Sequence, residues 1–112
     1  MKRERFEEII KILNDAKIYD SIEDSLDLIS NEEWDENFEE KASNINIDRR
    51  RHYETSERIW KVGDWYMGER HVSFCYSEMT SVEDTGVTAK FYEVERVERV
   101  SYDFIKKQEV TK

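Results

Sequence analysis

Residues 53–77, YETSERIWKVGDWYMGERHVSFCYS, indicate an antiparallel hairpin, because the hydrophobic period falls here from about 3.6 residues towards two. The first part, 53–65, reads as a strand, and residues 70–77 alternate cleanly between apolar and polar side chains. Gly68 suits the turn between them, since glycine accepts a positive φ. The side chains expected to point inward from the second strand are Val72, Phe74 and Tyr76.

Residues 87–105, VTAKFYEVERVERVSYDFI, fit two patterns. Valines recur every three residues from Val94 to Val100, as in a helix, whereas the β-branched and aromatic content favours a strand. A strand to about residue 95, a bend near Arg96 and a second strand through Phe104 would reconcile both patterns.

The sequence pattern of the first half of the chain predicts helices. Residues 2–16 carry apolar side chains at i, i+3, i+4 and i+7, which predicts a helix that packs on the core. Asp20 can cap a second helix and Ser30 a third that starts near Asn31. The face that this third helix turns to the core would hold Trp34, Phe38 and Ala42.

These elements predict an α+β fold in which three N-terminal helices pack on a C-terminal antiparallel sheet of three or four strands. The chain of 112 residues is expected to form one domain, 1–112, with a helical part at 1–45 and a β part at 53–105. Aromatic residues make up 12% of the chain, enough large side chains for a core despite 40% charged residues.

The charge of the protein is concentrated in residues 20–40, DSIEDSLDLISNEEWDENFEE. This stretch has ten acidic and no basic side chains, whereas bases outnumber acids by one elsewhere, so it accounts for the net charge of −9. Net negative charge argues against direct binding of nucleic acid or of an anionic membrane. The nearest basic cluster, 49–51, is short and flanked by acids, so it is a weak candidate for a nucleic-acid patch, and we expect it at least equally to neutralise the acidic stretch within the fold.

The acidic stretch allows two interpretations. Charged helix faces usually serve only solubility. Repulsion between like charges at i and i+4 costs a few tenths of a kcal/mol, however, so an uncompensated run suggests a binding face. The residues that would bind a basic partner are Asp24, Asp27, Glu32, Glu33, Asp35, Glu36, Glu39 and Glu40.

No catalytic or cofactor motif is evident, and we expect neither an enzyme nor a cofactor. His52 and His71 lack the spacing of a zinc site, Cys75 is the single cysteine, and no calcium loop or phosphate-binding glycine loop is present. No apolar run approaches the ~20 residues of a membrane-spanning helix, and residues 1–10 do not read as a signal peptide. We therefore expect a cytoplasmic protein that binds no metal. The sequence does not indicate its oligomeric state.

Two segments of the β part are IWKVGDWYMGERHVSFCYSE (59–78) and KFYEVERVERVSY (90–102). Both resemble segments of small acidic proteins of phages and mobile elements of Gram-positive bacteria. Those proteins often have an aromatic hairpin followed by an EVExVExVxY strand. The matching residues here are Glu93, Val94, Glu95, Val97, Glu98, Val100 and Tyr102. The resemblance covers residues 58–104 and implies an inhibitor of bacterial host defence that acts in the host cytoplasm, such as an anti-CRISPR protein or a DNA mimic.

Three functional hypotheses follow. The first is a stoichiometric inhibitor whose DNA-mimicking acidic face binds a basic nucleic-acid-handling protein, with a Cas effector nuclease as the first expected partner. The second is an immunity protein or antitoxin that neutralises a basic nuclease toxin. The third is an accessory module that binds through its sheet edge or aromatic hairpin, in which case 65–67 would matter more than the acids.

Overall fold

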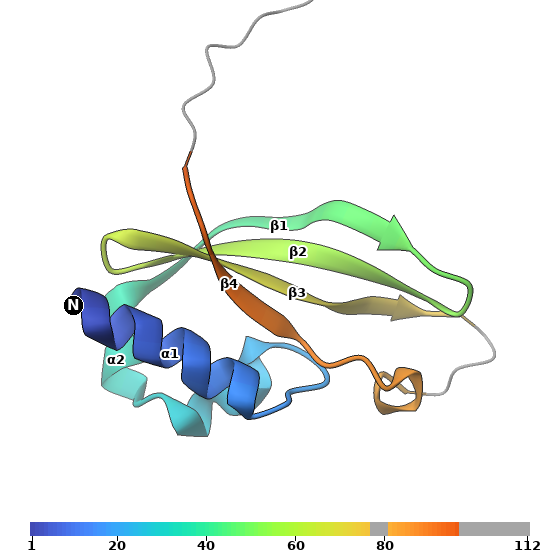
Figure 1. Cartoon of the computed structure of the whole chain (residues 1–112), viewed down its shortest axis with the longest axis horizontal. Helices are drawn as coiled ribbons and strands as arrows, with labels where there is room; N and C mark the ends of the chain where they lie inside the picture. Colours follow the sequence, from blue (N-terminus) through green and yellow to red (C-terminus); the bar gives the residue numbers. More distant parts are fainter. Residues whose placement is uncertain (77–80, 97–112) are drawn as a thin grey trace, which may run out of the picture.

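The chain folds around a four-stranded antiparallel sheet in which each strand pairs with its neighbour in the sequence (Figure 1). It is seen in a computed structural model that describes residues 1–76 and 81–96. The strands, in sheet order, are β1 (Phe38–Arg49), β2 (Tyr53–Val62), β3 (Trp65–Cys75) and β4 (Lys90–Val94). The helical segments are α1 (Arg3–Asp15), the 3-10 segment η1 (Ile22–Leu28), α2 (Asn31–Asn37) and the 3-10 turn η2 (Glu83–Thr85).

The α+β class is confirmed, but the prediction of three N-terminal α-helices is wrong. α1 forms as expected, and the predicted second helix is instead η1, two 3-10 turns joined by a kink at Ser25. Ile22 and Ile29 are nevertheless buried, as the sequence pattern requires. The short segment therefore places its apolar residues in the core without forming an α-helix.

The predicted third helix begins at the expected residue but is much shorter. α2 ends at Asn37, and Phe38 is extended, with φ −101° and ψ 130°. Trp34 and Phe38 still share one side, because both rings pack against Trp60, with centroids 5.0 and 6.3 Å away. The i, i+4 spacing therefore reflects a real contact. The backbone becomes a strand because β2 supplies hydrogen-bond partners from Phe38 onward.

The β2–β3 turn lies earlier than predicted. It consists of Gly63 and Asp64, with Gly63 at φ 62°, and Gly68 lies within β3 opposite Ile59. A Cβ at residue 68 would lie 2.4 Å from the Tyr92 ring, so close packing across the sheet explains this glycine. Phe74, expected to be buried, is 55% exposed.

The core lies between one face of the sheet and the helical segments, which Figure 1 shows on the same side of it. α1 contributes Phe6, Ile9 and Leu13, all fully buried. The sheet and the segment before β4 supply Trp60, Val62, Met67, Ala89 and Phe91. This single apolar cluster fixes the orientation of η1 and α2, because Ile22, Ile29 and Trp34 pack into it or against it.

Asn14 joins α1 to the outer edge of β4. Its Oδ1 accepts a hydrogen bond from the Phe91 N–H at 2.9 Å, and its Nδ2 donates one to the Phe91 carbonyl at 2.7 Å. The amide therefore takes the place of a further strand at this edge. β4 confirms the predicted strand up to about residue 95, while the predicted continuation through Phe104 lies outside the described residues. None of the helices in the described ranges is both long and apolar enough to cross a membrane.

The opposite face of the sheet, here called the open face, has no helix on it among the described residues (Figure 1). It carries a hollow of about 480 Å³ whose apolar lining includes Ala42, Ile45, Ile59, Tyr66 and Val94. Glu57, only 8% exposed, lies in this hollow and accepts hydrogen bonds from Asn46 Nδ2 at 2.6 Å and from the Tyr92 hydroxyl.

Candidate functional site at the acidic end

α2 presents three of the predicted binding residues to solvent. Glu32, Asp35 and Glu36, here called the α2 carboxylates, are exposed, and no ion pair involves them in the described part of the chain. Ser30 caps the helix, since its Oγ accepts a hydrogen bond from the Glu33 N–H at 3.1 Å. Acidic residues in the first turn also interact favourably with the helix dipole. Local sequence therefore explains both the start of α2 and its charge.

Packing anchors α2, because a helix of seven residues is not stable alone. The Trp34 ring stacks on Phe38 with centroids 4.7 Å apart. Glu33 receives hydrogen bonds from Arg5 Nε at 2.8 Å and from Arg5 Nη2 at 2.7 Å, and these bonds lower the pKa of Glu33. Glu33 thus ties α2 to α1, and its carboxylate is already compensated within the fold.

The two predicted binding residues on β1 lie on opposite faces of the sheet, and each is close to a basic side chain. Glu39 and Glu40 are consecutive in a strand and point to opposite faces of the sheet. Glu39 binds Lys41 at 2.9 Å, and this hydrogen bond lowers the pKa of Glu39. Glu40 lies 3.5 Å from Arg58 on the helix-covered face. The expected continuous acidic face is therefore smaller than predicted.

Of the two predicted residues in η1, Asp27 is exposed and lines a separate hollow with Asp20 and Glu83. The side chain of Asp24 lies outside the described part of the structure. The structure thus brings Glu32, Asp35 and Glu36 together, leaves Asp27 and Glu39 on other surfaces, and places Glu40 beside Arg58.

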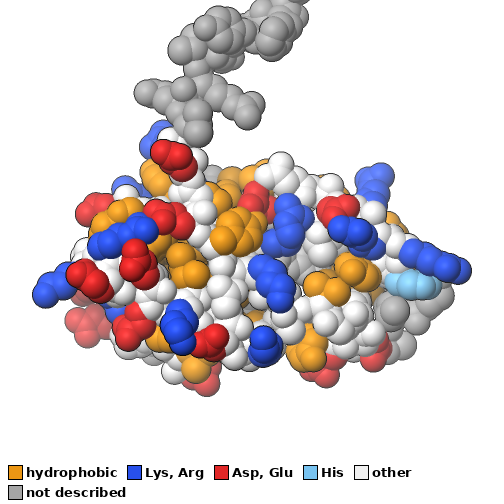
Figure 2. Space-filling model, viewed as in Figure 1, with side chains coloured by type: hydrophobic (Ala, Val, Ile, Leu, Met, Phe, Trp, Pro, Cys, Tyr) orange, Lys and Arg blue, Asp and Glu red, His pale blue; other side chains and the backbone are white. Residues whose placement is uncertain are grey.

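The basic cluster 49–51 does not neutralise the acidic end. Arg49 binds Glu54 at 3.0 Å and Arg50 binds Asp48 at 2.8 Å, so both pair locally at the β1–β2 turn. β1 has 12 residues, and at about 3.3 Å per residue this strand separates the turn from α2 by more than about 30 Å. In Figure 2 acidic side chains gather mostly towards the left end of the molecule, where Figure 1 places α2, and Lys and Arg lie among them there as well as across the middle and right.

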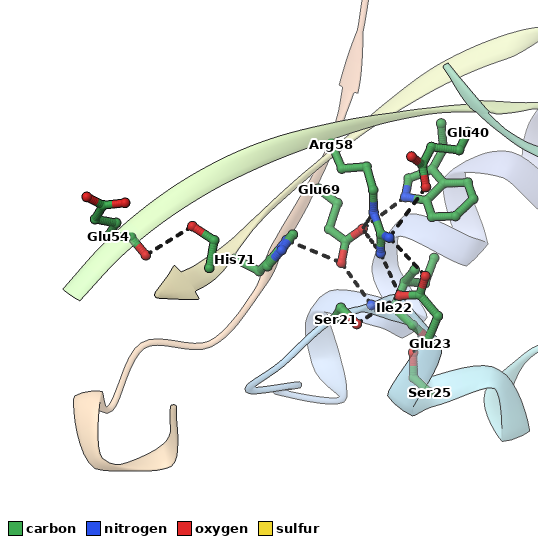
Figure 3. A network of polar contacts seen from close by, with 11 residues as sticks. Ser21, Ile22, Glu23, Ser25, Glu40, Glu54, Arg58, Glu69 and His71 are labelled. Carbon is green, nitrogen blue, oxygen red and sulfur yellow. Dashed lines mark hydrogen bonds and ion pairs between the residues drawn. The ribbon is translucent and has the colours of Figure 1, made fainter. Parts of the chain in front are cut away.

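A buried ionic network, which the sequence did not predict, links the sheet to the acidic end (Figure 3). Glu69 is fully buried, and its Oε1 accepts hydrogen bonds from Arg58 Nε and Trp60 Nε1, both at 2.9 Å. Its Oε2 accepts one from the Ile22 N–H at 2.8 Å. Correct placement of the turn at Gly63–Asp64 would have revealed the pair, since that register places Arg58 opposite Glu69.

Arg58 distributes its charge over several carboxylates. It donates to Glu23 at 2.9 and 2.6 Å and lies 4.6 Å from the centroid of the Trp60 ring. Burial alone would lower the pKa of Arg58, but hydrogen bonds with Glu23 and Glu69 outweigh it and raise the pKa. Burial likewise lowers the pKa of His71, against the attraction of the Glu69 charge. The network is suited to holding η1 on the sheet, because each Glu69 oxygen is occupied by donors.

The described residues include no group of three or more His, Cys, Asp or Glu side chains placed to hold a metal ion. The aromatic hairpin of the third hypothesis contributes mainly to packing. Trp65 packs on Phe6 with centroids 5.5 Å apart, Met67 is fully buried, and Tyr66 lines the open-face hollow.

Comparison with known proteins gives no relative from which a function could be transferred. No protein family, curated protein or solved structure matches the chain.

Proposed function

We propose that the chain is a non-catalytic inhibitor that binds a basic nucleic-acid-handling protein through the α2 carboxylates. The observation that carries the proposal is that Glu32, Asp35 and Glu36 are exposed and unpaired among the described residues, on an anchored helix. A carboxylate that is not compensated within its own fold keeps its full electrostatic attraction for a partner.

The spacing of these groups suits mimicry of a polyanion. Glu32 lies three residues before Asp35 and four before Glu36, so their side chains are neighbours at about 5–6 Å on the helix surface. Grooves that bind nucleic acid are lined by Lys and Arg, and a folded acidic surface can compete for them. Such binding should be fast, and it should weaken as salt screens the charges.

A Cas effector nuclease is the first partner to test, following the resemblance of 58–104 to small phage proteins. The assay measures DNA cleavage by the purified nuclease in the presence of the wild-type chain and of the triple variant Glu32→Lys, Asp35→Lys and Glu36→Lys. Each reversal replaces attraction by repulsion. We expect the inhibition constant to rise at least about 100-fold, equivalent to about 3 kcal/mol.

A matched variant controls for net charge. This control carries Asp15→Lys, Asp48→Lys and Glu95→Lys. The three substitutions change the net charge by the same amount as the α2 reversals and lie at partly or fully exposed positions outside α2. We expect this control to inhibit within a fewfold of wild type. It should unfold at a slightly lower urea concentration, because Asp15 and Asp48 lose exposed ion pairs with Lys11 and Arg50 that contribute at most about 1 kcal/mol each. Equal inhibition by both triple variants would refute a role for the α2 carboxylates.

A further inference from the structure

A second hollow, of about 470 Å³, lies where the loop after α1 meets η1 and η2. Its lining includes Tyr19 and Leu28, which are 38% and 41% exposed. In the described residues only five large hydrophobic side chains are exposed to this degree, and two of them meet here. Exposed apolar side chains grouped in a concave site with a polar rim are typical of protein interaction sites.

The rim of this hollow is acidic. Asp20, Asp27 and Glu83 contribute their carboxylates from three different segments, and no Lys or Arg lines the hollow within the described part of the chain. In the same part, none of the three forms an ion pair with a Lys or Arg side chain. The site thus combines an apolar surface with uncompensated negative charge, and it complements a segment that has the opposite charge and an apolar side chain.

We infer that this hollow receives an apolar side chain of the basic partner, and that Lys or Arg residues next to that side chain contact the acidic rim. The inference rests on the proposed function, because it assigns a second contact to the same basic protein. Asp27 and Leu28 end η1 only a few residues before α2 begins, so a single partner surface can reach both sites.

The two contacts would contribute differently to binding. Exposed charges such as the α2 carboxylates mainly accelerate association, and salt screens their effect. An apolar side chain that becomes buried between Tyr19 and Leu28 mainly slows dissociation, since its transfer from water is not salt-dependent in the same way. The hollow would therefore select which basic proteins stay bound.

Two short lysine-rich peptides of equal charge test the inference. One carries leucines, and the other has serines at the same positions. Binding is measured by fluorescence anisotropy, and the contact is located by NMR of the Leu28 methyl groups. We expect the leucine peptide to bind about tenfold more tightly than the serine peptide and to shift the Leu28 signals, because one apolar side chain is buried.

Substitutions at Leu28 provide the control, and its exposure makes misfolding a minor concern. Leu28→Ser should abolish the preference for the leucine peptide, and Leu28→Met should retain it. Equal affinity for both peptides, or a preference that survives Leu28→Ser, would overturn the inference. If both peptides bind equally and the triple α2 reversal weakens both, the hollow is refuted while the proposed function keeps its support. If the leucine preference disappears with Leu28→Ser but the triple α2 reversal leaves the affinity for both peptides unchanged, the hollow keeps its support and the proposed role of the α2 carboxylates is refuted.

Discussion

Two glutamates are buried in the sheet, one on each face, and they are stabilised in different ways. Glu69, on the helix-covered face, is fully buried and binds the guanidinium of Arg58. Glu57, on the open face, is 8% exposed, and its hydrogen-bond donors in the described part of the chain are the neutral groups of Asn46 and Tyr92. The fully buried carboxylate thus has a charged donor, whereas the carboxylate with residual exposure has neutral donors.

A fully buried carboxylate requires a compensating charge, because its desolvation costs several kcal/mol. Arg58 provides that charge and also binds Glu23 and approaches Glu40. The covered face therefore links the core to the acidic segments. Glu57 lines a hollow on the open face, where neutral hydrogen bonds suffice, and it contributes to the shape of that hollow.

The largest effect should come from Glu69→Leu. This substitution leaves the Arg58 guanidinium, the Trp60 indole N–H and the Ile22 N–H without their buried acceptor. We expect a loss of about 3–5 kcal/mol in the free energy of unfolding. Urea denaturation followed by tryptophan fluorescence measures it.

A double variant separates the charge from the packing. Arg58→Met combined with Glu69→Leu removes both members of the buried pair and should recover much of the stability lost by Glu69→Leu alone. If the double variant is no more stable than Glu69→Leu, compensation of charge is not what stabilises this face.

Gly68→Ala should perturb the open face next. The added Cβ would lie 2.4 Å from Tyr92 Cε2 and 3.1 Å from Glu57 Oε2, so the tyrosine ring must move from its hydrogen bond with Glu57. We expect a loss of about 1–3 kcal/mol by thermal or urea unfolding. In a Tyr92→Ala background the same substitution should cost much less, since the ring is gone. An equal cost in both backgrounds would contradict this explanation.

Gly68 also illustrates the limits of reading the sequence. The alternation of residues 53–77 predicted an antiparallel hairpin correctly, but the turn was expected at Gly68 and lies at Gly63. Packing against Tyr92 explains the glycine at position 68. Periodicity likewise predicted α1. It failed at Phe38, where pairing with β2 overrides a helical spacing. Such long-range contacts are not visible in local sequence patterns.

The candidate site was predictable only in part for the same reason. The exposure of Glu32, Asp35 and Glu36 follows from the helix that Trp34 anchors, and the sequence indicated both. The pairing of Glu33 with Arg5 depends on how α1 and α2 pack, which residue spacing does not show. The charge run therefore predicted a negative surface but overestimated its size.

Tyr92→Phe should have a smaller effect than either substitution above. It removes one neutral donor to Glu57, while Asn46 still donates and the hollow admits water. A hydrogen bond of this kind contributes about 1 kcal/mol to stability. Urea unfolding should therefore show a loss near this value, and a loss as large as that of Glu69→Leu would eliminate the distinction between the two faces.

The pH dependence of stability should give the smallest effect and should differ between the faces. On the covered side, burial would raise the pKa of Glu23, but hydrogen bonds from Arg58 and Ser21 outweigh it and lower the pKa below its ordinary value of 4.5. On the open face, burial and the hydrogen bond to Glu57 raise the pKa of Tyr92 from 10.0 to about 12.

These opposite shifts place the two losses of stability at opposite ends of the pH scale. A carboxyl whose pKa is lowered by folding stabilises the protein above its unfolded pKa, so the contribution of Glu23 is lost as the pH falls below about 4.5. A phenol whose pKa is raised stabilises below its unfolded pKa, so the contribution of Tyr92 is lost between pH 10.0 and about 12. Urea unfolding measured across pH checks both contributions. Glu23→Gln should lose part of the stability change at acid pH, and Tyr92→Phe should lose part of the change at alkaline pH. Each change in the free energy of unfolding should be less than about 1 kcal/mol, because both groups are partly exposed. If Tyr92→Phe left the alkaline limb unchanged, the Tyr92 hydroxyl would not be the group whose raised pKa stabilises the folded protein in this range.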